Sequence, residues 1–172
     1  GKKYGWDEKV PEENLQEIWG WQSKLHHLEN IKIPRCFKSG LVGEPTEIQL
    51  HFFSDASEIG YGAVGYLRFV TDLMILVAFV MGKSRVTPFK PQTMPRLELT
   101  ACRTSIQMFV SLQDKFSYEI GRIFFWTDST SALRKLAIKE TRFKVFDENR
   151  INEILRSSSL EQWSHVRSEN NP

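Results

Sequence analysis

Two aspartates stand at the points where strand-like segments end. Residues 48–54 form an apolar and aromatic run of strand length that stops at Asp55, and residues 123–127 form a second run that stops at Asp128. A buried strand needs its apolar side chains, but it does not need a carboxylate at its exit. Each aspartate alone is also explained as a turn or helix-cap residue, because Asp is common in both places. The repeated pattern predicts a site where the two carboxylates converge.

A third carboxylate, Glu98, falls in the first turn of a predicted helix. Thr93 or Met94 can cap this helix, and Pro95 fits its first turn. Apolar side chains then recur at helical spacing over roughly eighteen residues, at Leu99, Cys102, Ile106, Phe109 and Val110. Glu98 lies beside this apolar stripe. A surface glutamate that complements the helix dipole is the alternative interpretation of its position.

The elements around these acids predict one domain over residues 46–172. Five strands are expected, at residues 48–54, 61–70, 73–81, 122–127 and 162–166. Short turns join the first three, which indicates an antiparallel meander, and a basic loop at residues 82–93 leads into the long helix. Two shorter helices precede the last strand, one opening at residue 128, 129 or 130 and one starting at Val145. This order predicts an α/β domain with a mixed sheet and helices on both of its faces.

The three acids meet if the long helix returns the chain beside the first strand, so that the strand at 122–127 runs parallel to it. Asp55 and Asp128 then lie in the crevice where such sheets bind ligands, and the helix can bring Glu98 to the same place. Carboxylates held together repel one another, so folded proteins keep them mainly where cations bind. Oxygen ligands select hard ions such as Mg²⁺ or Mn²⁺. Two such ions about 4 Å apart can activate a water and cleave a phosphodiester.

Residues 1–45 are expected to form a helical connector and a linker. Pro11, Glu12 and Glu13 make a helix start, with proline in the first turn and acidic residues facing the helix dipole. The helix carries one apolar stripe, formed by Leu15, Ile18, Trp19, Gln22, Leu25 and Leu28. The stripe predicts a packing face, and residues 38–45, which contain glycine and proline, are typical of a linker.

The composition excludes several classes of protein. With 41% apolar residues in 172, the chain can bury a core, so global disorder is excluded. The net charge of +2, from 23 basic and 21 acidic residues, is too small to argue for nucleic-acid binding. No apolar run approaches the ~18 residues of a membrane span, and no signal peptide is visible. Cys36 and Cys102 lie far apart, which fits a reduced intracellular protein that is not secreted.

Six short motifs surround the three acids. They are Phe53-Ser54-Asp55-Ala56-Ser57, Tyr61-Gly62-Ala63-Val64, Lys83-Ser84-Arg85-Val86, Pro95-Arg96-Leu97-Glu98-Leu99, Trp126-Thr127-Asp128-Ser129-Thr130 and Trp163-Ser164-His165-Val166. Together they resemble the RNase H region of BEL/Pao retrotransposon polyproteins. Residues 5–36 are similar to the segment that joins polymerase to RNase H there, so the resemblance covers nearly the whole chain. This region is also called the Pao retrotransposon "peptidase", but an aspartic protease needs a glycine after Asp-Ser or Asp-Thr, which neither aspartate has.

The resemblance implies an RNase H-like fold and hydrolysis of the RNA strand of RNA–DNA hybrids. The resemblance also implies that Asp55, Glu98 and Asp128 are the catalytic residues and the ligands of two Mg²⁺ or Mn²⁺ ions. Their order separates this pattern from transposases and integrases, in which the glutamate comes last. The implied partners are the hybrid and the adjacent polymerase domain of the same polyprotein, without a membrane or a small-molecule cofactor. The implied location is the cytoplasm or a retroelement particle.

The family pattern continues past Asn-Pro to a fourth aspartate, whereas this chain stops at Pro172. We therefore expect an RNase H-like domain truncated at its C-terminal end, which can be inactive alone even where its parent protein is active. The competing expectation is a catalytically inactive RNase H-like domain that supports a polymerase or binds nucleic acid or a partner.

Nucleic-acid contacts are expected from polar residues near the acids, namely Lys83, Arg85, Arg96, Ser129, Asn149 and Arg150. Basic side chains bind phosphates in a salt-dependent way. For these basic residues, a solvated surface is the alternative interpretation. For Ser129, capping of the helix that follows Asp128 explains the residue equally well.

Overall fold

The chain forms two compact units in the computed structural model, which describes residues 7–138 and 143–172. The first unit is Gly1–Arg35 and the second is Cys36–Pro172. Residues 38–45, expected as a linker, therefore belong to the second unit. The apolar side chains of Phe37 and Leu41 are partly buried there and pack against the hydrophobic core.

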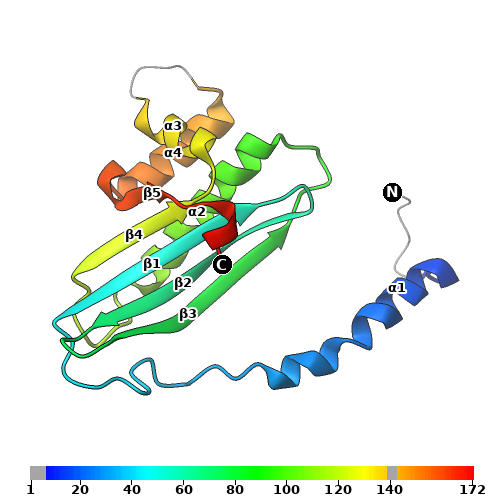
Figure 1. Ribbon diagram of the computed structural model, residues 1–172. Helices are drawn as coiled ribbons and strands as arrows, with labels where there is room; N and C mark the ends of the chain where they lie inside the picture. The colour runs from blue at the N-terminus through cyan, green and yellow to red at the C-terminus, as the bar shows by residue number, and fades with distance from the viewer. Residues whose placement is uncertain (1–6, 139–142) are drawn as a thin grey trace. The chain divides into compact units, whose positions relative to one another are not determined.

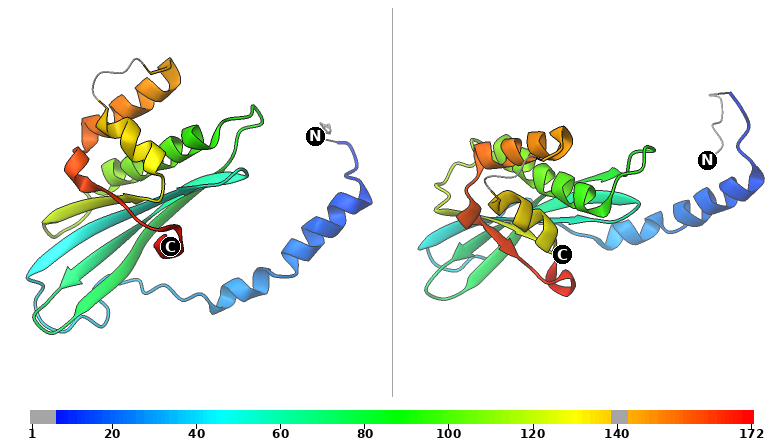
Figure 2. Two further views of the ribbon diagram at one scale, coloured as in Figure 1. Left: turned by 45° about the horizontal axis from the view of Figure 1, so that its top comes forward. Right: turned by 90° about the horizontal axis from the view of Figure 1, so that it is seen from above.

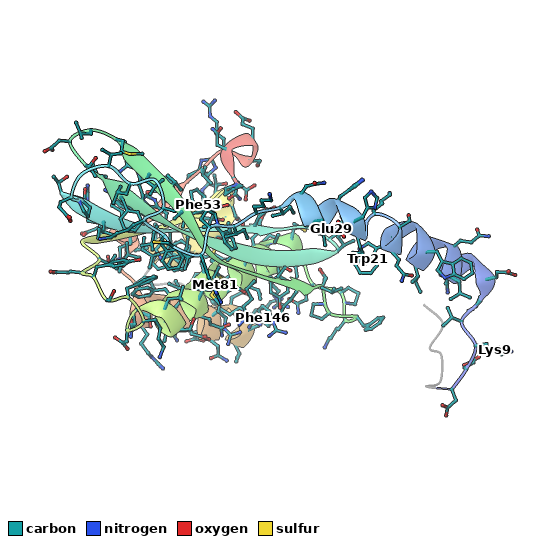
Figure 3. All side chains as sticks on the ribbon, turned by 90° about the horizontal axis from the view of Figure 1, so that it is seen from below. Lys9, Trp21, Glu29, Phe53, Met81 and Phe146 are labelled. Carbon is teal, nitrogen blue, oxygen red and sulfur yellow. The ribbon has the colours of Figure 1, made fainter. Side chains whose placement is uncertain are left out.

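The first unit is mainly helical. Its helix α1 (Glu12–Gln22) begins after Pro11, whose carbonyl accepts hydrogen bonds from the backbone of Asn14 and Leu15. A short 3₁₀ helix, η1 (Leu25–Asn30), follows after a turn. The predicted apolar stripe is thus divided between two helices. Trp19 and Trp21 remain more than half exposed, and Trp21 is seen on this unit in Figure 3.

The second unit is built on a five-stranded sheet with the order β3-β2-β1-β4-β5 (Figure 1). The strands are β1 (Glu47–Ala56), β2 (Gly60–Val70), β3 (Ile75–Val86), β4 (Arg122–Thr127) and β5 (Trp163–His165). The first three form the expected antiparallel meander. β4 lies parallel to β1, and β5 lies parallel to β4. The mixed sheet confirms the fold class expected from the sequence.

Strand β3 is longer than expected and includes residues predicted to be a basic loop. Lys83 and Arg85 pair with Ala63 and Tyr61 of β2. The close pairing depends on Gly62, because a Cβ atom there would lie 2.9 Å from the carbonyl oxygen of Lys83. The glycine therefore lets two strand backbones approach, and the two cations lie on a regular strand.

Three α-helices of the second unit lie on one side of the sheet (Figure 2). They are α2 (Met94–Leu112), α3 (Thr130–Ala137) and α4 (Val145–Ser157). Leu50 and Phe52 of β1 and Phe125 of β4 are fully buried in one core with apolar residues of all three helices. Full burial of each such side chain contributes about 1.5–3 kcal/mol, so this core holds β1, β4 and α2 together.

The opposite face of the sheet carries aromatic side chains. His51 stacks on Phe124, with ring centroids 4.8 Å apart, and accepts a hydrogen bond of 3.0 Å at Nδ1 from Nε1 of Trp126. These residues alternate along the strands with the buried ones, so they point to the other side. The helices of the second unit that the structure describes thus share one face, rather than lying on both as expected, because the fully buried side chains of β1 and β4 are on that face.

Two further sequence expectations concern cysteines and membranes. Cys36 is exposed and Cys102 is buried, and both are free thiols. Burial raises the pKa of the Cys102 thiol to about 11, so this sulfur stays protonated at neutral pH. Among the described residues, no helix has the length and apolar character that crossing a membrane requires.

Candidate active site

The register of β1 and β4 brings two of the predicted acids to neighbouring positions. Ser54 of β1 pairs with Thr127 of β4, and the next residues are Asp55 and Asp128. Because the two strands are parallel, both aspartates lie at the same edge of the sheet. The Ser54 hydroxyl donates a hydrogen bond of 3.1 Å to the carbonyl of Trp126 and lies 3.6 Å from Sγ of Cys102. Ser54 therefore joins β1, β4 and α2 directly beneath this edge.

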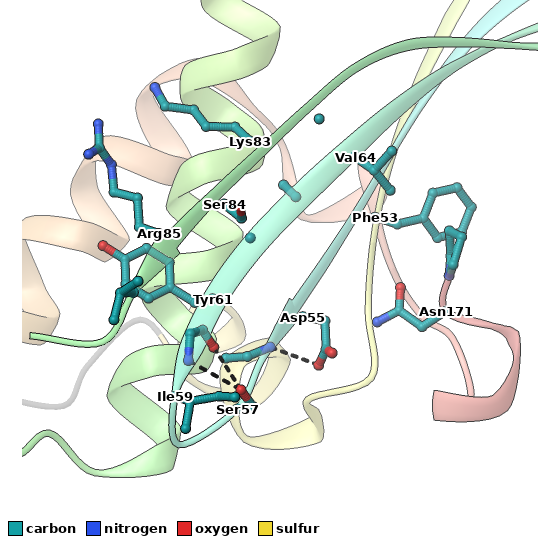
Figure 4. Close-up of a pocket in the computed structure, with 17 residues that line it drawn as sticks. Phe53, Asp55, Ser57, Ile59, Tyr61, Val64, Lys83, Ser84, Arg85 and Asn171 are labelled. Carbon is teal, nitrogen blue, oxygen red and sulfur yellow. Dashed lines mark hydrogen bonds between the residues drawn. The ribbon is translucent and has the colours of Figure 1, made fainter. Parts of the chain in front are cut away.

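Asp55 lies in an open hollow. The side chain is exposed, and its Oδ1 accepts a hydrogen bond of 2.7 Å from the backbone of Ala56. The hollow has a volume of about 680 Å³ and is lined by the ends of β1, β2 and β3 together with Asn171 and Pro172 (Figure 4). Lys83 and Arg85 belong to the same lining. Because Asp55 is in register with Gly62 and Ser84, the alternation of side chains directs the two cations to the other side of the strands.

Asp128 is held by the C-terminal segment of the chain. Its Oδ2 accepts a hydrogen bond of 2.7 Å from the hydroxyl of Ser168. Nearby, the amide of Asn171 donates to the backbone carbonyl of Ser54 at 3.2 Å. Sequence reasoning missed Ser168, because it lies 40 residues from Asp128 and no local spacing signals the contact.

Glu98 is the fifth residue of α2, one turn after the helix begins at Met94, and it contacts the start of α3. Its Oε2 accepts hydrogen bonds from the hydroxyls of Ser129, at 2.6 Å, and Ser131, at 2.8 Å. Ser129 is also the N-cap of α3, since its Oγ accepts a hydrogen bond of 3.0 Å from the backbone of Ala132. Capping is therefore one function of Ser129, as one interpretation of the sequence held. Ser131 was not predicted, because its contact with Glu98 joins residues that lie 33 apart in the sequence.

None of the three acids has a basic partner within 4 Å in the part of the chain that the structure describes. The carboxylate oxygens are the donors that Mg²⁺ and Mn²⁺ prefer, so the donor set fits hard divalent cations. Residues 7–138 and 143–172 contain no group of three or more acidic, histidine or cysteine side chains already arranged around a common point. The donor chemistry of the three acids fits such an ion, while their side chains are not assembled into a metal centre.

The residues predicted to contact nucleic acid differ in how far the fold already engages them. Arg96 and Arg150 are engaged within the fold: the guanidinium of Arg150 lies 3.4 Å from the Phe146 ring centre, and Nε of Arg96 lies 3.4 Å from Oδ1 of Asp147. Arg150 also donates to the hydroxyl of Thr100 at 3.1 Å. Lys83 and Arg85 instead line the open hollow, and Asn149 is exposed on α4.

Comparison with known proteins agrees with this architecture. The model of the Pao retrotransposon-like RNaseH-like domain family matches residues 1–129. The N-terminal RNase H domain of Rv2228c from Mycobacterium tuberculosis superposes with a TM-score of 0.51 at 12% identity, over 73% of this chain and 86% of that one. A foamy viral protease-reverse transcriptase dRH, solved with double-stranded DNA, has a TM-score of 0.51 at 15% identity.

The match to the foamy viral protein covers 99% of this chain but only 26% of that one, so the chain spans about a quarter of its length. No curated protein sequence matches the chain. The two structural likenesses concern the fold, and the family match extends over three quarters of the residues, from the connector to the serine after Asp128. The chain therefore belongs to the family of Pao retrotransposon-like RNaseH-like domains.

Proposed function

We propose that this domain is the ribonuclease H of a retrotransposon reverse-transcriptase polyprotein and hydrolyses the RNA strand of RNA–DNA hybrids. The observation that carries the proposal is the surroundings of Asp55, Glu98 and Asp128, which have no basic partner in the described part of the chain. Carboxylates near one sheet edge without a counter-charge are suited to an external cation. Membership of the RNase H-like family indicates which reaction such a cation serves.

In this proposal Asp55, Glu98 and Asp128 hold two Mg²⁺ or Mn²⁺ ions. When bound, such ions activate the attacking water and stabilise the leaving oxygen of a phosphodiester. The chain's own residues keep the ligands in place: Ser168 orients Asp128, while Ser129 and Ser131 orient Glu98. Burial of Ser54 and Thr127 keeps the two strand ends in register behind the aspartates.

The hybrid is proposed to lie along the hollow beside Asp55. Lys83 and Arg85 lie on the strand that borders it, with their side chains on the other side of that strand, and there they can bind phosphates in a contact that would weaken as salt rises. Because RNA differs from DNA at the 2′-hydroxyl, the domain must read that group to choose the strand it cleaves. The adjoining polymerase of the same polyprotein is the proposed partner that supplies the hybrid.

The proposal is tested by cleavage of an RNA strand labelled at its 5′ end and annealed to DNA, with Mg²⁺ or Mn²⁺. The assay uses the 172-residue chain and the protein expressed from its complete reading frame. We expect the protein from the complete reading frame to cleave the RNA strand, and we expect its Asp55→Asn variant not to cleave it. Glu47→Gln, at the far end of the same strand, is the matched control and should cleave normally.

Two results would count against the enzyme. Undiminished cleavage by Asp55→Asn would contradict the proposed catalytic site. Tight binding of the hybrid without cleavage, by the protein from the complete reading frame and with either ion, would instead support an inactive RNase H-like domain that binds nucleic acid.

A further inference from the structure

We infer that Ser131, together with Ser129, is a positioning residue that presents one chosen oxygen of Glu98 to a divalent cation. The inference rests on the proposed function, because it concerns the same carboxylate. It adds a role for the first turn of α3 that the predicted ligand set does not contain.

The hydrogen bonds of the two serines leave little choice of proton position. The Oγ atom of Ser129 accepts a hydrogen bond from the backbone of Ala132 at 3.0 Å, and its own proton points to Oε2 of Glu98 at 2.6 Å. Ser131 lies 2.8 Å from Oε2 and 3.1 Å from Oγ of Ser129. A carboxylate oxygen attracts the Ser131 proton more strongly than a neutral hydroxyl does. Both hydroxyls therefore donate to Oε2.

This arrangement makes the two oxygens of Glu98 unequal. Oε2 receives two donors, whereas no described residue donates to Oε1. Without such contacts a glutamate side chain turns about three bonds, and ordering it when a ligand binds costs up to about 2 kcal/mol. The serines meet this ordering cost during folding, so the cation finds Oε1 already in place. Residues that orient metal ligands in this way typically change metal affinity or activity about 10- to 100-fold when removed.

The side chain of Asp147, on α4, connects the last turn of α3 to α2. Nζ of Lys135, on α3, lies 3.1 Å from Oδ2 of Asp147, and Nε of Arg96, two residues before Glu98, lies 3.4 Å from Oδ1. Asp147 is buried, with 9% of its surface exposed, so both contacts are shielded from solvent. The serines are thus carried on a helix that is tied to the helix of the glutamate.

Ser131→Ala separates this role from a role in stability. Ser131 does not cap α3, and alanine is a better helix former than serine, so the variant is expected to fold normally. We expect its Mn²⁺ affinity, measured by isothermal titration calorimetry on the whole chain, to fall about 10- to 100-fold. Its melting temperature without added cation should equal that of the unmodified protein.

Two matched variants serve as controls. Thr130→Ala removes a hydroxyl from the same turn, but Thr130 is exposed and makes no side-chain hydrogen bond among the described residues, so its Mn²⁺ affinity should not change. Ser131→Thr retains the hydroxyl and should restore most of the affinity. Mn²⁺ affinity in Ser131→Ala equal to that of the unmodified protein would overturn the inference.

Asp128→Asn, titrated in parallel, distinguishes this inference from the proposed function. If Asp128→Asn loses Mn²⁺ binding while Ser131→Ala keeps it, the metal site stands and only the positioning role is wrong. If the unmodified chain binds no Mn²⁺, or Asp128→Asn binds it undiminished, the metal site itself is wrong and the inference falls with it.

Discussion

The two ends of the β1–β4 pair both carry acids, but in different surroundings. Where the strands begin, Glu47 accepts two hydrogen bonds from the guanidinium of Arg122, the one between Nη2 and Oε2 measuring 2.8 Å. These bonds lower the pKa of Glu47 to about 2. Where the strands finish, Asp55 and Asp128 have hydrogen-bond donors but no basic partner in the described part of the chain.

This difference separates a structural carboxylate from one that is available to a ligand. At the first end the counter-charge is part of the sequence, so the acid is satisfied when the chain folds. At the second end no basic side chain of the described chain balances the negative charge, which the proposed function assigns to an ion from solution, and the nearby hydroxyls of Ser168, Ser129 and Ser131 donate to the carboxylates without neutralising them. Under the proposed function, the sheet thus has one closed end, at Glu47, and one reactive end, at Asp55 and Asp128.

Replacing one acid at each end is expected to give the largest difference between the two ends, measured as the rate of hybrid cleavage. Asp128→Asn should lower the rate of RNA–DNA hybrid cleavage at least about 10³-fold, since a metal ligand contributes several kcal/mol of transition-state stabilisation and about 1.4 kcal/mol corresponds to tenfold. Glu47→Gln should leave the rate within about twofold, because exposed ion pairs contribute little. Initial rates on a labelled hybrid measure both. Equal losses in the two variants would contradict the distinction between the ends.

A divalent cation should stabilise the folded protein through the reactive end. At about 100 times its dissociation constant, Mg²⁺ should raise the free energy of unfolding by about 2.7 kcal/mol, because only the folded state holds the site together. Urea unfolding with and without Mg²⁺ measures this increase. Glu47→Gln should retain the increase and Asp128→Asn should lose it. An increase that persists in Asp128→Asn would place the cation elsewhere.

On the same strand as Glu47, His51 should instead make the stability of the fold depend on pH. Burial lowers the pKa of His51 to about 4, with smaller effects from Arg68 and Arg122, whereas its ordinary value is 6.5. The unfolded chain therefore binds a proton more readily, and stability present above pH 6.5 is lost as the pH falls towards 4. We expect a loss of roughly 1–2 kcal/mol, less than the full shift because the ring is half-exposed.

Unfolding by urea between pH 7 and pH 4 measures this loss, and His51→Gln should flatten the curve in that range. Glu47 acts at lower pH, since its stabilising effect is lost only as the pH falls from about 4.5 towards 2. A pH dependence that is unchanged in His51→Gln would assign it to another group.

The smallest expected effect is that of Glu47→Gln on stability. The pair with Arg122 is exposed to solvent, with 60% of the Arg122 side chain accessible, so its attraction is screened by water and salt. The melting temperature should fall by no more than about 2 °C, and the difference should disappear in 1 M salt. Scanning calorimetry at low and high salt measures it. A large fall in melting temperature that salt does not reduce would mean that the Glu47–Arg122 pair is essential for the stability of the fold.

The strands and the long helix could be predicted because their signals are local. The alternation of residues 48–54 and the helical spacing from Leu99 to Phe109 are set by neighbours in the chain, and both elements form close to the expected bounds. The end of β3 was less predictable. Lys83 and Arg85 are typical of a loop, and they pair only because Gly62, about twenty residues earlier, lets the strands approach.

The residues of the candidate site also differ in whether the sequence could predict them. Asp55, Glu98 and Asp128 could be proposed as site residues from residue type and order, since each lies near the end of a strand or the start of a helix. Their partners could not, because Ser168 reaches Asp128 across 40 residues and Ser131 reaches Glu98 across 33. The confinement of the described helices of the second unit to one face also depends on how aromatic side chains pack on the other, which a linear pattern does not contain.

Residue types and their order therefore were enough to indicate the elements, the mixed sheet and the acids at its edge, because propensity, alternation and capping act over a few residues. Folding in three dimensions settled which acids are neutralised. Arg122 meets Glu47 across 75 residues, while no basic side chain of the described chain reaches Asp55, Glu98 or Asp128. Charge is a property of the residue, but its compensation depends on distances that only the packed chain defines.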